Sequence, residues 1–215
     1  MKSLRIHRLI ESGSCALGLL LTAFGFLSLL RWAGSEPHRH LIVLAVVIAS
    51  AALADLISGL VHGFADHFGD PQTPWLGPAF IAPFREHHDL PMKMTEHDFI
   101  ETNGNTFILI CLALVLAYGL GGSMWMAFLA PLCAWVAATN QIHKWAHDPE
   151  RAPAVYRWLA RHELILSAKR HAFHHRGEHA SHFCITFGRL SFIADRIVNW
   201  ARDRSLRSSQ MGRLK

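Results

Sequence analysis

The sequence predicts an all-α, multi-pass membrane protein with four transmembrane helices and a histidine-rich cytoplasmic cap of interfacial helices. Of its 215 residues, 51% are apolar, and they gather in long runs without charge. The 16 histidines concentrate where these runs end, and the chain after residue 147 holds 13 of the 21 Lys and Arg residues. This composition is too apolar for an ordinary soluble domain of this length.

The first predicted span covers residues 12–30, which carry no charge. A helix of this length crosses a hydrocarbon core of about 30 Å. The basic residues Arg5 and Arg8 before it would also suit a signal peptide, but the sequence RWAGSEP after it contains no small-x-small cleavage site. We therefore expect an uncleaved span.

The second predicted span, LIVLAVVIASAALADLISGLV, contains one charge, Asp55, and leads directly into HGFADHFGD. His62 and Asp66 are four residues apart, so they share a helical face. An aspartate inside an apolar span is costly in lipid and is expected to face a partner or water. Asp55 has two possible roles, as a hydrogen-bonding group behind metal ligands or as a structural pairing group.

Residues 68–105 are rich in proline and include FREHHDLPMKMTEHDFIETNGN, which predicts an interfacial loop with short helical pieces. The neighbouring His87 and His88 cannot share one helical face. One could bind a metal while the other turns toward a second metal or a nearby carboxylate. Considered alone, these would be surface histidines in a polar loop.

Residues 102–142 contain no charge and no histidine, a length that fits two spans better than one. The glycines at 119, 121 and 122, followed by Ser123, predict the turn between them. The second of these spans ends as TNQIHKWAH, with His143 and His147 four residues apart. This repeats the arrangement at the end of the second span.

The densest histidine cluster is KRHAFHHRGEHASH, residues 169–182. On a helix, His171, His175 and His179 follow one another at i, i+4 steps, with His174 close to the same face. Neutral imidazole is a common ligand for iron, zinc and copper, and the four scattered cysteines cannot form a thiolate site. A solvated basic loop or a pH sensor is the alternative for this cluster.

Charge supplies an independent argument for a common site. With four spans, the excess of Lys and Arg places both termini in the cytoplasm, and the thirteen histidines from His62 to His182 then lie at that membrane face. Residues 148–215 mix basic and apolar residues at helical spacing, which predicts helices on an anionic membrane surface. The apolar and aromatic residues beside the charges, and the spans before them, argue against a nucleic-acid partner.

The expected pocket holds more ligands than the three or four that one zinc ion takes, and it therefore suits two metal ions. Nitrogen and oxygen donors without thiolate fit iron, which with dioxygen attacks unactivated C–H bonds. A site where spans leave the membrane favours a lipid substrate. The candidate ligands are His62, Asp66, His87, His88, His143, His147, His171, His174, His175 and His179.

The strings DLISGLVHGFADHFGD, PAFIAPFREHHDLPMKMTEHDFIETNGN, NQIHKWAH and KRHAFHHRGEHASHFCIT closely resemble the lipid desaturase family over residues 45–200. The resemblance implies a di-iron enzyme with dioxygen as co-substrate and a cytochrome-type or ferredoxin-type electron donor. The family's ligand motifs match the ten candidates above, whereas His67, His162 and His182 fit them poorly. We expect a basic N-terminus, first span and external link in 1–40, the desaturase domain in 41–200 and a basic tail in 201–215.

Within the family, FREHH and the loop to HDFIETNGN look most similar to the plasmanylethanolamine desaturase branch. That branch converts a 1-O-alkyl ether phospholipid to a vinyl ether plasmalogen; the resemblance implies hydrogen abstraction beside the ether oxygen, then loss of a second hydrogen. Arg85, Lys144 and Lys169 are candidates for binding the phosphate headgroup, and interfacial snorkelling is their alternative role. The expected location is a bacterial inner membrane or the endoplasmic reticulum, with the site on the cytoplasmic face.

Other functions remain open. The family also contains a plastid desaturase of phosphatidylglycerol, so an acyl-lipid substrate is one alternative. A zinc-dependent membrane lipid hydrolase is another, although it would use only three of the histidines. A metal transporter would place ionisable residues through the membrane depth, where only Asp55 is found.

Overall fold

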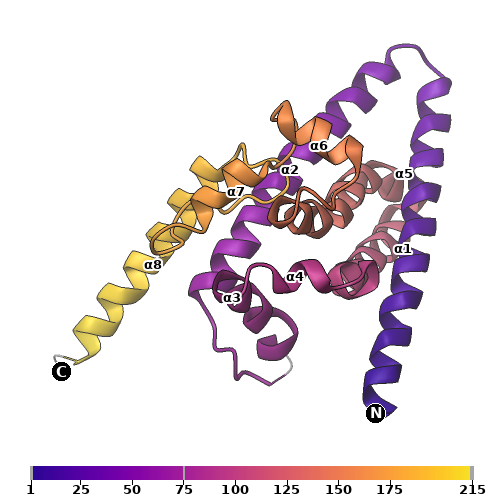
Figure 1. Cartoon of the computed structure of the whole chain (residues 1–215). Helices are drawn as coiled ribbons and strands as arrows, with labels where there is room; N and C mark the ends of the chain where they lie inside the picture. Colours follow the sequence, from indigo (N-terminus) through magenta and orange to yellow (C-terminus); the bar gives the residue numbers. More distant parts are fainter. Residues whose placement is uncertain (1, 75, 214–215) are drawn as a thin grey trace. The chain divides into compact units, whose positions relative to one another are not determined.

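The computed structural model describes residues 2–74 and 76–213, and this part of the chain is helical without a strand (Figure 1). The all-α prediction is therefore confirmed. Residues 214–215, the end of the predicted basic tail, lie outside the described residues. Three helices are long and apolar enough to cross a membrane: α1 (Lys2–Gly34) over Arg5–Gly34, α2 (Arg39–His67) and α5 (Phe99–His147).

Helix α5 is a hairpin of two antiparallel arms rather than one rod. Its backbone leaves the helical region at Gly121 and Gly122, and Gly122 has a φ of 68°, which favours glycine. The Asn140 side chain donates hydrogen bonds to the Thr102 carbonyl at 3.1 Å and to the Thr106 hydroxyl at 3.0 Å. A straight helix would separate residues 102 and 140 by about 57 Å. The predicted turn is thus confirmed at these glycines.

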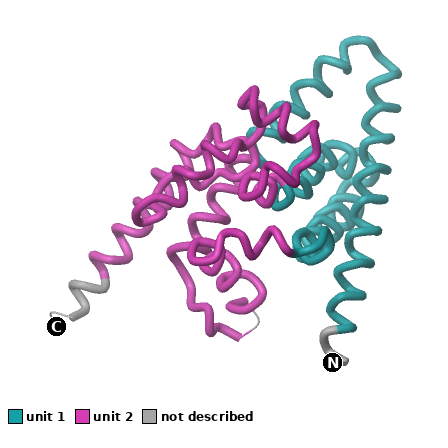
Figure 2. Tube along the Cα trace, in the orientation of Figure 1, with its two compact units in different colours: residues 1–54, 97–141 teal, residues 55–96, 142–215 magenta. Residues whose placement is uncertain are grey.

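The chain forms two compact units, and α2 and α5 each contribute residues to both of them (Figure 2). Unit 1 comprises residues 1–54 and 97–141. Its core joins α1 to both arms of the hairpin. The buried members of this core are Cys15, Phe107, Ile110, Leu114, Met126 and Cys133.

Unit 2 comprises residues 55–96 and 142–215 and contains the ten candidate ligands. Its helical pieces after α2 are a π-helical turn, Gly77–Ile81, and then α3 (Ala82–Asp89) and α4 (Lys93–Glu96), as expected for the proline-rich loop. The chain after α5 forms α6 (Ala154–Arg161), α7 (Ala168–His174) and α8 (Ser191–Arg213).

The core of unit 2 packs the start of α8 and the segment before it against α2. Phe183, Cys184, Ala194 and Val198 are buried together and contact apolar residues of α2. Gly59 of α2 allows this approach, because a Cβ at this position would lie 2.5 Å from Cys184 Sγ and 2.8 Å from Ala194 Cβ. The core thereby fixes the segment 180–190 beside the histidines of α2.

Candidate metal centre

Helix α2 contributes its last buried polar residues to the site. His62 is fully buried, and Asp66, one turn later, has a side chain only 3% exposed. Each polar side chain buried in this way needs a partner to offset its lost hydration. The i, i+4 pairing expected from the sequence is present, with His62 Nε2 3.5 Å from Asp66 Oδ2.

Helix α3 presents His87 and His88, whose ring centroids lie 4.0 Å apart. His87 Nδ1 donates to the Phe84 carbonyl, which leaves Nε2 without a hydrogen. His88 turns toward Asp66, with its Nε2 3.1 Å from Oδ1. Although neighbours on a helix leave it in different directions, both side chains reach one ligand group, together with His62 and His174.

A convergence of four nitrogen atoms joins the end of α5 to α7. His171 Nε2 lies 2.9 Å from His143 Nε2, 2.9 Å from His147 Nε2 and 3.0 Å from His175 Nε2. A neutral imidazole carries one hydrogen in total, so one ring nitrogen cannot form three such bonds. Two nitrogens bound to one metal at about 2.1 Å, and at right angles, would lie about 3.0 Å apart. This donor set fits a metal ion and does not fit a hydrogen-bonded cluster.

The candidate ligands divide into three overlapping groups among the described residues, each of which could hold a metal ion. One group is His87, His143, His147, His171 and His175; a second is His62, His87, His88 and His174; a third is His88, His175 and His179. Asp66 belongs spatially with the second group, because its oxygens lie 3.1–3.5 Å from Nε2 of His62, His88 and His174.

Several buried ligand atoms in this cluster have no hydrogen-bond partner. They include both Asp66 oxygens, His62 Nε2, His87 Nε2 and His174 Nε2. The short contacts of Asp66 lack hydrogen-bond geometry, although their distances are those of ion pairs. Buried polar atoms are almost always satisfied in native proteins. The residues therefore fit a cation, which would satisfy the carboxylate and the imidazole nitrogens together.

Backbone carbonyls before α8 fix the orientation of two further ligands, as that of Phe84 does for His87. His62 Nδ1 donates to the Phe183 carbonyl at 3.1 Å, and His174 Nδ1 donates to the Ser181 carbonyl at 2.8 Å. A carbonyl only accepts, so the hydrogen must sit on Nδ1 and the Nε2 lone pair must face the cluster.

Burial keeps three of the ligands outside the membrane-spanning helices, His87, His171 and His175, neutral. Burial, followed by the neighbouring histidines, lowers the pKa of His87 to about 2 and of His175 to about 3. The same causes hold the pKa of His171 well below its usual range. Metal ligation needs the neutral ring, so these imidazoles are in their binding form at neutral pH.

The structure corrects one expectation about the histidine-rich stretch. Helix α7 ends at His174, and Gly177 follows with a φ of 63°, so the expected helical line through His179 is wrong. His179 instead has a φ of 52° and reaches the cluster from a turn, with its ring 4.1 Å from that of His88. The glycine ends the helix because it adopts this conformation without a Cβ clash.

The poorly matching histidines lie around the cluster or away from it. His67 contacts the His179 carbonyl at 3.2 Å, and the His182 ring stacks on Phe173. His162 follows α6 and is exposed. None of these three belongs to a ligand group among the described residues.

The headgroup candidates differ in their surroundings. Arg85 donates to carbonyls at the end of α2, with bonds of 3.0 Å to Phe68 and 2.9 Å to Gly69. Lys169 is exposed on the face of α7 opposite His171 and lines a surface cavity of about 570 Å³. Lys144 lies one residue beyond His143 near the end of α5. Headgroup binding by these three residues stays a prediction.

Asp55 has a role that sequence reasoning left open. Its carboxylate, 1% exposed, accepts four backbone N–H groups of residues 187–190 at 2.7–2.9 Å. It is therefore a structural pairing group that anchors a loop to α2. The signal available in the sequence was the isolated charge in an apolar span, which indicates a partner without identifying it.

The model of the lipid desaturase domain matches residues 51–213. Plasmanylethanolamine desaturase 1 of Mus musculus is 40% identical over 186 residues, covering 82% of this chain and 67% of that protein. Plasmanylethanolamine desaturase of Myxococcus xanthus is 36% identical over 185 residues, covering 80% of this chain and 66% of that protein.

A more distant relative is the chloroplastic fatty acid desaturase 4 of Arabidopsis thaliana, 27% identical over 88% of this chain and 57% of that protein. The chain thus spans about two thirds of the length of the mouse and bacterial relatives. No solved structure matches the chain.

Proposed function

The chain belongs to the lipid desaturase family, and we propose from this premise that it is a di-iron, dioxygen-dependent desaturase of a 1-O-alkyl ether phospholipid. The product would be the vinyl ether of a plasmalogen. The observation that carries the proposal is the convergence of nine histidines and Asp66 in unit 2, with unpartnered nitrogen and oxygen atoms aimed at one another.

Two iron ions suit this donor set better than other metals. The ligands number more than one tetrahedral zinc site takes, and the four cysteines, all free and at least partly buried, supply no thiolate to the groups. His143, His147, His171 and His175 would hold one ion. Asp66, with His62, His88 and His174, would hold the other.

The reaction balances with an external reductant. A CH2–CH2 unit, dioxygen, two electrons and two protons give the alkene and two molecules of water. Bound iron would supply the activation of dioxygen that no side-chain acid or base provides. The histidines hold their nitrogens fixed and neutral for this purpose. Electrons would come from a cytochrome-type or ferredoxin-type protein.

The membrane arrangement supports a lipid substrate. Helices α1 and α2 and the two arms of α5 would form four spans, with both termini and the metal ligands on the cytoplasmic side. Helices α3, α4, α6, α7 and α8 would cover this side as an interfacial cap. A lipid tail would then enter from the bilayer, while Arg85, Lys144 or Lys169 would hold the phosphate.

The acyl-lipid alternative has support in the similarity to the Arabidopsis desaturase. The greater identity to the two plasmanylethanolamine desaturases favours the ether lipid. A zinc hydrolase would leave most of the histidine cluster without a role.

Lipid mass spectrometry of a host that makes ether lipids, with and without this protein, tests the reaction. We expect acid-labile vinyl ethers only in cells that contain the protein. New double bonds confined to acyl chains would support the acyl-lipid alternative, and an unchanged lipid profile with two bound irons would contradict desaturation in that host.

Variants connect the reaction to the cluster. His143→Ala, His171→Ala and His62→Ala should each abolish vinyl ether formation, because each removes one nitrogen from a ligand group. His162→Ala, an exposed histidine outside the groups, is the matched control and should retain activity. Full activity in a ligand variant would remove that residue from the metal centre.

A further inference from the structure

Residues 182–190, before α8, have no helix to satisfy their backbone, yet side chains bind nearly all their amides. Eight N–H groups, those of residues 182–185 and 187–190, donate to four side chains. The acceptors are Asp55, Ser58, Ser191 and Asp195. A segment held at so many points has one backbone conformation, which makes it a suitable support for other groups.

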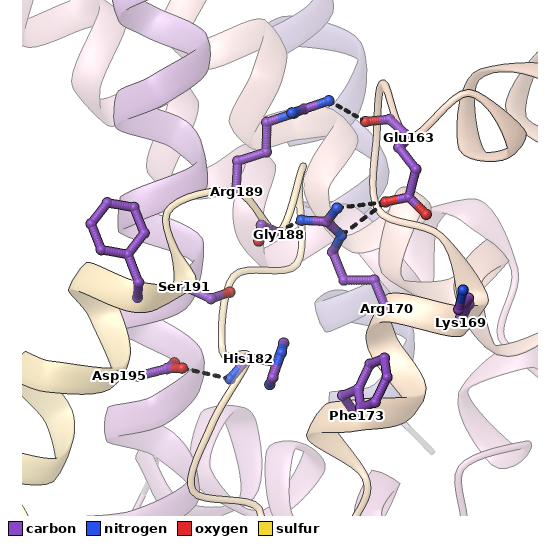
Figure 3. Close-up of a pocket in the computed structure, with 10 residues that line it drawn as sticks. Glu163, Lys169, Arg170, Phe173, His182, Gly188, Arg189, Ser191 and Asp195 are labelled. Carbon is purple, nitrogen blue, oxygen red and sulfur yellow. Dashed lines mark hydrogen bonds and ion pairs between the residues drawn. The ribbon is translucent and has the colours of Figure 1, made fainter.

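One of these bonds leads directly to a ligand. Asp195 Oδ2 accepts the His182 N–H at 2.9 Å, as drawn in Figure 3. The carbonyl of the same peptide unit, that of Ser181, accepts from His174 Nδ1 at 2.8 Å. Carboxylate, peptide and imidazole therefore form a continuous chain of hydrogen bonds that ends at His174 Nε2, 3.4 Å from Asp66.

A second chain reaches the other oriented ligand. Ser191 Oγ accepts the Cys184 N–H at 3.2 Å. The carbonyl of that peptide unit, that of Phe183, accepts from His62 Nδ1 at 3.1 Å. Two residues near the start of α8, Ser191 and Asp195, thus bind both peptides whose carbonyls orient His62 and His174.

We propose that Asp195 and Ser191 are positioning residues of the metal centre, each acting on one ligand imidazole through an intervening peptide group. The proposal rests on the proposed metal centre and extends it by two residues that touch no ligand. Metal-bound histidines commonly donate their second nitrogen to a carboxylate or carbonyl, which fixes the ring and raises its basicity. In this protein the peptide group between Ser181 and His182 transmits the effect of the Asp195 carboxylate to His174, because successive hydrogen bonds polarise one another.

Asp195 is the stronger of the two positioning residues. Its second oxygen accepts the Phe183 N–H at 3.2 Å, so the carboxylate bridges two successive amides. The negative charge of the Asp195 carboxylate, which accepts the N–H of this peptide group, makes the Ser181 carbonyl a better acceptor. His174 Nε2 in turn becomes a better electron-pair donor to a metal. Ser191 acts without charge and should have the smaller effect.

The two positioning residues line the surface cavity shown in Figure 3, apart from the ligands. Asp195 and Ser191 line it together with Phe173, and none of the ten candidate ligands does so. A substitution at Asp195 therefore changes the support of His174 without placing a new group against a ligand nitrogen.

Binding of Co²⁺ to the metal-free chain of 215 residues in detergent tests this proposal, with visible absorption as the record of the ligand field. Asp195→Asn should weaken the binding of Co²⁺ by about 10- to 100-fold and alter the spectrum, the usual effect of a group behind a ligand. The Asn amide still accepts one N–H, so the fold of the segment should persist. Asp203→Asn, the same change at an exposed position of α8, should behave as wild type.

A double-variant cycle separates positioning from general stability. In a His174→Ala background, Asp195→Asn should cause no further loss of Co²⁺ affinity, because its effect passes through His174. Equal losses in both backgrounds, or a wild-type affinity and spectrum in Asp195→Asn, would overturn the inference. Ser191→Ala should weaken binding in the wild type and have no effect in a His62→Ala background, which tests the second chain even if Asp195→Asn fails to fold.

Co²⁺ binding by the wild-type protein tests the proposed metal centre separately from the positioning role. A wild-type protein that binds no Co²⁺ would overturn the proposed metal centre and the positioning role with it. A wild-type protein that binds Co²⁺, beside an Asp195→Asn protein that binds it equally well, would overturn only the positioning role.

Discussion

Replacing Asp55 with alanine should destabilise unit 2 by about 3–5 kcal/mol, the cost of removing one partner from a buried charged pairing. The carboxylate accepts four N–H groups at 2.7–2.9 Å and is 1% exposed. Hydrogen bonds to a charged group contribute about 1.5–3 kcal/mol each, so a simple sum over the four bonds gives about 6 kcal/mol or more. The loss of stability in Asp55→Ala should be smaller than this sum. The hydrogen bonds of Phe187, Arg189 and Leu190 are only partly buried, so water can replace the carboxylate at these amides.

Denaturant unfolding in detergent measures this loss as a change in the free energy of unfolding. Asp55→Asn keeps one acceptor oxygen and should lose about half as much as Asp55→Ala. Asp203→Ala is the control, because Asp203 is exposed on α8. A loss below about 1 kcal/mol for Asp55→Ala, the value of one neutral hydrogen bond, would refute the anchoring role.

Three further outcomes test the site, the packing and the topology. Asp66→Asn should lose both iron and activity if the carboxylate binds metal directly, whereas retained iron with turnover reduced about 10- to 100-fold would assign it to a position behind the ligands. Gly59→Ala should lower the thermal midpoint because its Cβ would meet Cys184 at 2.5 Å, while Gly13→Ala, with open space around it, should not. A membrane-impermeant thiol reagent applied from the cytoplasmic side should label Met92→Cys and leave Glu36→Cys unlabelled; the reverse pattern would contradict the proposed orientation.

The helical class and the position of the hairpin turn follow from local sequence. Long apolar runs must form helices in lipid because each backbone polar group needs an internal partner. Glycines at 121 and 122 interrupt one such run, and the structure turns there. The i, i+4 pairs His62–Asp66 and His143–His147 are equally local, since helix geometry alone puts both members on one face.

The helices after α5 were predicted less completely. Spacing over residues 148–215 predicts helices without locating their ends, and the structure interrupts them between α6 and α7. Glu163 takes a φ of 56° there and pairs with Arg170, which donates also to the Gly188 carbonyl. Periodicity cannot detect this break, because the competing partners come from elsewhere in the chain.

The sequence by itself determined which residue types could bind metal and which helix faces carry them. Tertiary structure alone decided how they are grouped, that His179 arrives from a turn, and that Asp55 binds the backbone of residues 187–190. The reason is physical: a residue's helical face depends on its near neighbours, whereas the bond from His62 to Phe183 joins atoms 121 residues apart. This contact requires the core around Cys184 to pack against α2, so no local sequence pattern predicts it.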